Sequence, residues 1–225
     1  MAFEAQAAYV TQRYAHLLTL EQDYERVQQA ALRRSVRHCY GTAGRNISNL
    51  GINAFSPDPL RKYIGNANHG RILKTKPQDL RGKWEYDLDD QGCVLQARWH
   101  EDRVDSPVIA DNILVPSAVP EDATYLHYTH TRKLGILLNY AIIYSYGEDG
   151  RLAAILKCWW GSDMTRNPHF ELLAFSWDGD RLQWVDEYGF TVRHLAIYPD
   201  ENREVFILGQ PYQGRHRRLP ALLDQ

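Results

Sequence analysis

The chain has 225 residues and a formal net charge of −2, so it lacks the basic excess typical of proteins that bind nucleic acid non-specifically. Its three cysteines, Cys39, Cys93 and Cys158, are odd in number and far apart, which argues against a disulfide framework and a structural zinc site. We therefore expect reduced thiols, no nucleic-acid partner, no cofactor and no bound metal.

The first residues carry no recognisable export signal. Residues 1 to 6 lack the basic start and the apolar block of a secretory leader. The apolar stretch from Leu134 to Ile143 contains Gly135 and Asn139 and is too short to span a bilayer. The sequence predicts a cytoplasmic protein that does not associate with a membrane.

Residues 3 to 37 have the periodicity of an amphipathic helix. Apolar side chains recur mostly at spacings of three and four, without Gly or Pro between them: Phe3, Ala7, Val10, Tyr14, Leu17, Tyr24, Val27 and Ala31. The pattern fits one long helix or two consecutive ones, in a helical segment that we assign to residues 1–38. This segment either packs on a sheet or serves as a dimerisation or partner-docking arm, so the chain is expected to be a monomer or a homodimer.

Residues 39–69 are rich in Gly, Asn and Pro, and we expect an irregular loop there. The sequence Gly-Thr-Ala-Gly-Arg-Asn at 41–46 superficially resembles a phosphate-binding loop. It lacks the Gly-Lys-Ser/Thr ending and the flanking strand and helix of such loops, so a nucleotide site is not predicted.

From residue 70 to 210 the chain has the period-2 alternation of β-strands. Four segments repeat one pattern, in which alternating aromatic or apolar residues are followed by an Asp/Gly turn and a second strand. They begin at Trp84, Tyr144, Phe175 and, more weakly, Ala196. The last of them predicts a turn between strands at 193–198 and 203–209.

This succession of hairpins predicts an antiparallel meander of about eight or nine strands. The expected fold class is α+β, mainly β, with a long N-terminal helix packed on a large antiparallel sheet. Residues 211–225 are expected to form a C-terminal tail, and the whole chain one globular domain.

Alternation also assigns side chains to the two faces of the sheet. Leu156 and Cys158 point to an apolar face, whereas Lys157 and Trp159 point away from it. The solvent face derived in this way combines both charge signs with a large aromatic side chain, which suits protein recognition. We predict that six residues on this face bind a protein partner: Arg98, His100, Lys157, Trp159, Gln183 and Glu187.

Trp159 is the most informative of these six residues. It is adjacent to Trp160, and on a regular strand only one of the two can face the core. Trp159 is therefore either covered by the N-terminal helix or part of a recognition patch.

Residues with catalytic or metal-binding potential are scattered. His127 and His130 are three apart, so on a strand they point to opposite faces and cannot readily bind one ion. Cys158 is expected to be a small core residue. The aspartates are assigned to turns, where Asp favours tight bends: Asp87, Asp89, Asp90, Asp178 and Asp180. No catalytic residue and no metal ligand is predicted, which favours a non-enzyme without deciding the question.

The segment Tyr-Ser-Tyr-Gly-Glu-Asp-Gly-Arg-Leu at 144–152 resembles the tyrosine-aspartate repeat of RHS-type proteins, whose pattern is Tyr-x-Tyr-Asp-x-x-Gly-Arg-Leu. Gly147 stands where that pattern has Asp. The segments at Trp84 and Phe175 keep the Asp, with a longer and a shorter turn respectively. The resemblance implies β-hairpins in these three segments.

In style, this small β-rich chain is also similar to the immunity proteins of bacterial polymorphic-toxin loci. Those are soluble, cytoplasmic, non-enzymatic inhibitors that block the active site of a toxin. The similarity implies a protein-binding module that neutralises a cognate toxin. The alternative is a small enzyme or ligand-binding protein with a site in a curved β-sheet or barrel.

Overall fold

The computed structural model describes residues 2–42, 70–100, 109–117, 119–131, 134–159, 168–179, 181–193 and 196–206. The chain divides into two compact units, each built from separate stretches of sequence. Unit 1 comprises Met1–Leu20, Pro116–Thr124 and Tyr140–Gln225, and unit 2 comprises Glu21–Val115 and Tyr125–Asn139. The structure is 54% strand with two N-terminal helices, so the prediction of a mainly β, antiparallel meander is confirmed.

The helical segment consists of two helices, α1 (Ala2–Leu17) and α2 (Tyr24–Leu32), instead of one long helix. After α1 the chain tightens into a turn, because the amides of Thr19 and Leu20 bond to carbonyls only three residues back. The side chain of Asp23 then accepts a hydrogen bond from the amide of Arg26 and caps the start of α2. Among the described residues, no helix is both long and apolar enough to cross a membrane.

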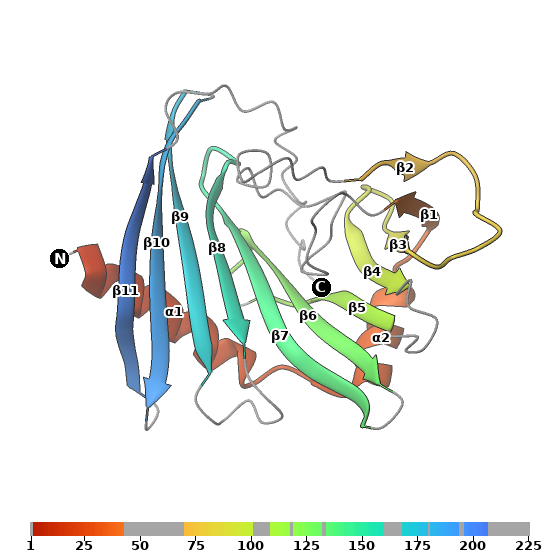
Figure 1. Cartoon of the computed structure of the whole chain (residues 1–225), viewed down its shortest axis with the longest axis horizontal. Helices are drawn as coiled ribbons and strands as arrows, with labels where there is room; N and C mark the ends of the chain where they lie inside the picture. Colours follow the sequence, from red (N-terminus) through yellow and green to blue (C-terminus); the bar gives the residue numbers. More distant parts are fainter. Residues whose placement is uncertain are drawn as a thin grey trace. The chain divides into compact units, whose positions relative to one another are not determined.

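Unit 2 is a sheet in which most strands are neighbours in chain order. Its strands are β1 (Arg37–Thr42), β2 (Ile72–Leu73), β3 (Lys83–Leu88), β4 (Val94–His100), β5 (Ile109–Val115) and the later part of β6 (Asp122–Thr131). They are hydrogen-bonded in the order β6-β5-β4-β3-β1-β2 (Figure 1).

Strand β1 departs from the prediction, because residues 39–42 had been assigned to the irregular loop. Cys39 pairs with Tyr86 and Gly41 with Trp84 in an antiparallel ladder with β3. A Cβ on Gly41 would lie 3.0 Å from the Tyr86 ring, so this position favours glycine for packing reasons. The rest of the predicted loop, residues 43–69, and the predicted tail, residues 211–225, lie outside the described residues.

Unit 1 contains most of the later strands of the antiparallel order. Its strands are β7 (Gly135–Tyr146), β8 (Leu152–Trp159), β9 (His169–Asp178), β10 (Arg181–Arg193) and β11 (Ala196–Phe206), in the order β11-β10-β9-β8-β7. The first residues of β7 belong to unit 2, as do the last residues of β6.

Three of the four repeated segments form the predicted hairpins, β3–β4, β7–β8 and β9–β10. Their turns contain Gly92, Gly150 and Gly179 at positive φ, a conformation that favours glycine. The side chain of Asp89 accepts hydrogen bonds from the amides of Gln91 and Cys93, which is the backbone role expected of a turn aspartate.

The fourth segment does not form a hairpin. Ala196–Phe206 is a single strand, β11, and it pairs with β10 on both sides of Pro199. The register shifts between Gly189 and Phe190, opposite the proline, and the ladder continues on both sides of this shift. Because β11 ends the strand order, its proline needs no partner on a second side. The predicted turn at 199–202 is therefore wrong.

Helix α1 packs on one face of the sheet in unit 1. Val10, Tyr14 and Leu17 are buried, and the Tyr14 ring meets the edge of the Phe170 ring at 5.1 Å between centroids. Phe170 is the ladder partner of Cys158, so α1 covers the face to which Cys158 points. Figure 1 shows α1 running across the strands of unit 1. Cys158 itself is buried, which confirms its prediction as a core residue.

Candidate functional site

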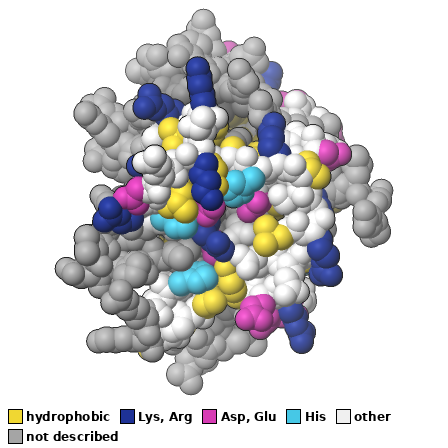
Figure 2. Space-filling view, turned by 90° about the vertical axis from the view of Figure 1, so that its right-hand side faces the viewer, with side chains coloured by type: hydrophobic (Ala, Val, Ile, Leu, Met, Phe, Trp, Pro, Cys, Tyr) yellow, Lys and Arg dark blue, Asp and Glu magenta, His cyan; other side chains and the backbone are white. Residues whose placement is uncertain are grey.

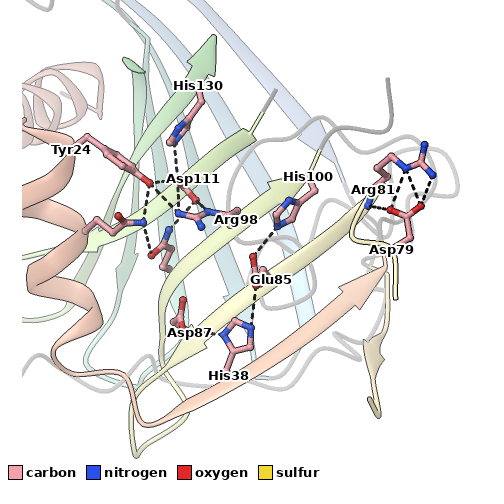
Figure 3. Close-up of polar contacts among 12 residues, drawn as sticks. Tyr24, His38, Asp79, Arg81, Glu85, Asp87, Arg98, His100, Asp111 and His130 are labelled. Atoms are coloured by element: carbon pink, nitrogen blue, oxygen red, sulfur yellow. Dashed lines mark hydrogen bonds and ion pairs between the residues drawn. The ribbon is translucent and has the colours of Figure 1, made fainter. Parts of the chain in front are cut away.

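One face of the sheet in unit 2 carries a series of polar side chains, and we call it the polar face. Glu85, Arg98 and Asp111 are successive ladder partners on β3, β4 and β5, and residues opposite one another in an antiparallel ladder share a face. Helix α2 packs on the same face, because the hydroxyl of Tyr24 donates a 2.6 Å hydrogen bond to Asp111. The arrangement is drawn in Figure 3.

Asp111 is the centre of the first cluster on the polar face. Its carboxylate is fully buried and accepts hydrogen bonds from donors on α2, β4 and β6: Tyr24 Oη at 2.6 Å, Arg98 Nε at 2.8 Å, Gln96 Nε2 at 2.9 Å and His130 Nε2 at 2.9 Å. Burial alone raises the pKa of Asp111, but the bonds from His130 and Arg98 outweigh burial and hold the pKa well below its usual range. The cluster fixes a negative charge beneath α2.

Tyr24 connects this cluster to the helix. Its hydroxyl also accepts a hydrogen bond from Arg98 at 3.0 Å and one from Gln28 at 2.9 Å. The Tyr24 ring stands edge-on to the ring of His130, with centroids 4.8 Å apart. Burial and the neighbouring Asp111 raise the pKa of Tyr24, so its hydroxyl remains a donor. The first cluster therefore anchors α2 to the sheet.

A second cluster lies on β1, β3 and β4, and we call it the histidine–carboxylate row. His100 Nε2 contacts Glu85 Oε2 at 2.8 Å, and His38 Nε2 contacts Glu85 Oε1 at 3.3 Å. His38 Nδ1 lies 3.0 Å from Asp87 Oδ1. The four side chains thus alternate in the order His100, Glu85, His38, Asp87 (Figure 3).

These four side chains are partly open to solvent. The exposed fraction is 38% for the His38 side chain, whereas Glu85, Asp87 and His100 each keep about a fifth of their surface accessible. The face drawn in Figure 2 shows histidine side chains among basic, acidic and hydrophobic ones. The row is therefore a surface of mixed character.

The row also has a defined protonation requirement. Both ring nitrogens of His38 face carboxylate oxygens, so both can donate only when the ring carries two protons. The hydrogen bond from His100 lowers the pKa of Glu85, against the opposing effect of burial. In the described part of the chain, no group of three or more His, Cys, Asp and Glu side chains is arranged to hold a metal ion.

An aromatic side chain borders the row. The ring of Tyr40 meets the ring of His38 edge-on at 4.8 Å, and the ammonium of Lys76 lies 5.9 Å from the centre of the Tyr40 ring. Val36, just before β1, has 68% of its surface exposed. Charged and aliphatic groups are thus exposed near the row, and the buried ring of Tyr40 packs beside His38.

Two of the six predicted partner-binding residues, Arg98 and His100, lie on the polar face. Arg98 bonds to Asp111 and keeps 29% of its side chain exposed, and His100 bonds to Glu85. The other four lie in unit 1, so the six residues do not share one unit. Lys157 pairs with Glu171 at 2.6 Å.

Trp159 does not lie beneath the N-terminal helix. It points to the face opposite Cys158, whereas α1 packs on the Cys158 face. The Trp159 ring neighbours the rings of Tyr140 and His169, with centroids 6.5 Å and 6.0 Å away. Its prediction as part of a recognition patch stays a prediction.

Gln183 and Glu187 both lie on β10. Gln183 falls at a register shift and donates a 3.3 Å hydrogen bond to Asp178. Glu187 pairs with Leu173 in the ladder with β9, and its side chain lies outside the described part of the structure.

Sequence reasoning missed most of the polar face. Asp87 had been assigned to a turn but lies within β3, because the hairpin turn begins only at Asp89. His127 and His130 do contact neighbours on opposite faces, Asn112 and Asp111, as their spacing predicts. No family model, no curated protein and no solved structure matches the chain.

Proposed function

We propose that this chain is a non-enzymatic protein-binding module and that its partner docks on the polar face of unit 2. The observation that supports this most directly is the histidine–carboxylate row. Its side chains come from three strands, are partly exposed and hold one another through hydrogen bonds. A surface fixed in this way loses little side-chain entropy when a partner binds.

The composition of the surface favours a protein partner. Glu85 and Asp87 supply negative charge, Lys76 and Arg98 supply positive charge, and Val36 supplies an exposed aliphatic side chain just before β1. Protein interfaces combine polar contacts of this kind with a few aromatic and arginine anchors. Nucleic-acid surfaces instead need clustered cations.

The partner that we propose is a toxin domain, which this chain would neutralise as immunity-type inhibitors do. The similarity in style to such inhibitors suggests the partner's class, and the polar face supplies a place where it would bind. In this proposal the protein acts in the cytoplasm, as a monomer or a homodimer, and blocks the toxin by occupying its active site.

The test uses the product of the neighbouring reading frame. That product is expressed in a bacterial host with and without this chain, and growth is measured together with the affinity of the purified pair by calorimetry. We expect co-expression to restore growth. A toxic neighbour that neither binds this chain nor is relieved by it would contradict the proposal.

Variants then locate the binding surface. His38→Gln and Glu85→Gln should each weaken binding about tenfold or more, because each removes a contact in the row. Arg151→Gln, at the Arg151–Asp149 ion pair of unit 1, is the matched control and should leave affinity unchanged. If only the control weakens binding, the partner docks on unit 1 and the assignment to the polar face is wrong.

A further inference from the structure

The opposite face of the sheet in unit 2 carries aromatic side chains, and we call it the aromatic face. Trp84 and Trp99 are ladder partners on β3 and β4, and Tyr86 and Ala97 form the next pair that points the same way. On β5, Asn112 pairs with Ala97 and therefore shares this face. The ring of Trp84 lies 5.4 Å from that of Trp99 and 6.0 Å from that of Tyr86, measured between centroids.

A series of hydrogen bonds ends at Asn112. The side-chain amide of Asn139 donates to Thr129 Oγ1 at 2.5 Å, and Thr129 Oγ1 lies 3.3 Å from His127 Nε2. His127 Nδ1 lies 3.0 Å from Asn112 Oδ1. Because Oδ1 can only accept, His127 donates from Nδ1 and receives the Thr129 hydroxyl at Nε2.

This direction of the hydrogen bonds requires that the imidazole of His127 is neutral, and its environment favours the neutral form. His127 is buried, and burial lowers its pKa to about 3, so the ring is uncharged at neutral pH. Each side chain in the series therefore donates a hydrogen bond to the next one. The final donor is the Nδ2 group of Asn112.

Among the residues that the structure describes, neither the Nδ2 group of Asn112 nor the indole Nε1 of Trp99 has a hydrogen-bond partner. Asn112 is 0% exposed and Trp99 is 7% exposed, so solvent does not satisfy these donors from outside. In the ladder between β4 and β5, Asn112 pairs with Ala97 and Trp99 pairs with Ala110. Because Ala97 and Trp99 are two positions apart on β4, and Ala110 and Asn112 two positions apart on β5, Trp99 and Asn112 are diagonal neighbours on the aromatic face. Buried donors without acceptors are rare in native proteins.

We propose that Asn112 and Trp99 bind the acceptor oxygen of a small uncharged molecule that has a carbonyl group and an aromatic or apolar body. Both N–H groups would donate to the carbonyl oxygen, and the rings of Trp84, Trp99 and Tyr86 would contact the body. This site is distinct from the partner-docking surface, since it lies on the other face of the sheet.

The choice of an uncharged ligand follows from the charges on this face. The positions of β3, β4 and β5 that share it, from Trp84 and Tyr86 to Ala110 and Asn112, carry no charged side chain. The donors are neutral, and His127 is neutral as well. A buried carboxylate would meet no cation on these three strands, whereas a carbonyl oxygen needs only the two donors.

Benzamide, toluene and benzoate are suitable probes, because they share one ring and differ in the acceptor. Binding is followed by nuclear magnetic resonance on protein labelled with ¹⁵N in its indoles, and the Trp99 signal is the one that disappears in Trp99→Phe. We expect benzamide to bind more tightly than toluene and to move the Trp99 indole signal. Benzoate should bind weakest.

Two variants separate hydrogen bonding from ring packing. Trp99→Phe removes the N–H and should weaken benzamide about tenfold while changing toluene little, which reduces the ratio of the two affinities. Trp84→Phe, a ring neighbour on the same face, should weaken both probes alike. The proposal is overturned if benzamide fails to bind at millimolar concentration, if it binds no better than toluene, or if the Trp99 signal does not move, since an internal water would then be the partner of these donors.

Discussion

Asp111 is the residue on which the contacts of the polar face converge. A fully buried carboxylate is stable only when cations and hydrogen-bond donors compensate it, and here Arg98, His130, Gln96 and Tyr24 do so. The residue also joins helix α2 to strands β4 and β6. The contribution of Asp111 to folding can therefore be measured as the change in unfolding free energy when the residue is replaced.

Asp111→Ala should destabilise the protein by about 3 kcal/mol or more, because the substitution leaves the guanidinium of Arg98 partly buried without its counter-charge. The free energy of unfolding is measured by urea denaturation. Asp79→Ala, which breaks the exposed pair with Arg81, is the control and should have no measurable effect. Equal losses in the two variants would contradict the anchoring role of Asp111.

Glu85 gives a pH dependence with a definite sign. Its pKa in the folded protein is lowered from the ordinary value of 4.5, mainly by the hydrogen bond from His100, so its contribution to stability is present above that value. The contribution is lost as the pH falls through the lowered pKa. The difference in unfolding free energy between the wild type and Glu85→Gln should therefore shrink in acid below about pH 4.

Urea denaturation over a series of pH values measures this difference. Asp111 and the other shifted carboxyls are present in both proteins, so their effects cancel in the comparison. A difference that stays constant from neutral pH down to about pH 3 would show that the contact with His100 does not stabilise the folded state.

At the scale of elements, local sequence was sufficient wherever the stabilising contacts are local. The three hairpins combine alternating aromatics with a turn glycine at positive φ, and they form where predicted. Strand β1 was missed because it is held by the ladder with β3, more than forty residues away, and Gly41 interrupts its pattern.

The β7–β8 turn allows a paired glycine test. Gly150 has a φ of 75°, so Gly150→Ala should cost about 1 to 2 kcal/mol of stability. Gly147 lies in the same turn without a positive φ, and a Cβ there would approach the end of the Asp149 side chain at 3.1 Å and the Arg151 carbonyl at an ordinary 3.9 Å. Gly147→Ala should therefore cost less. Thermal unfolding of the two variants compares them, and the reverse order would contradict this description of the turn.

At the scale of the whole molecule, the candidate site could be predicted only in part. Alternation along β4 correctly put Arg98 and His100 on one face. It could not show that Asp111 and Tyr24 meet Arg98 there, because these contacts join segments whose proximity depends on the tertiary structure. A face expected to meet solvent is thus partly covered by α2.

Trp159 tests whether unit 1 also meets the partner. Because α1 packs on the opposite face, Trp159→Ala should leave most of the stability intact, in contrast to the roughly 3 kcal/mol or more expected for an aromatic residue sealed in a core. If Trp159 anchors the interface, partner affinity should fall by about 2 kcal/mol or more. Thermal stability and calorimetric affinity are measured on the same variant, and unchanged affinity would remove Trp159 from the interface.

The interleaving of the two units has a consequence for protein synthesis. Helix α1 is made well before its packing partner, because Tyr14 packs against Phe170, which is made more than 150 residues later. At the usual rates of translation that interval is on the order of ten seconds. During this time the apolar stripe of α1 has no sheet of unit 1 to cover it, so the stripe stays exposed until β9 has been made.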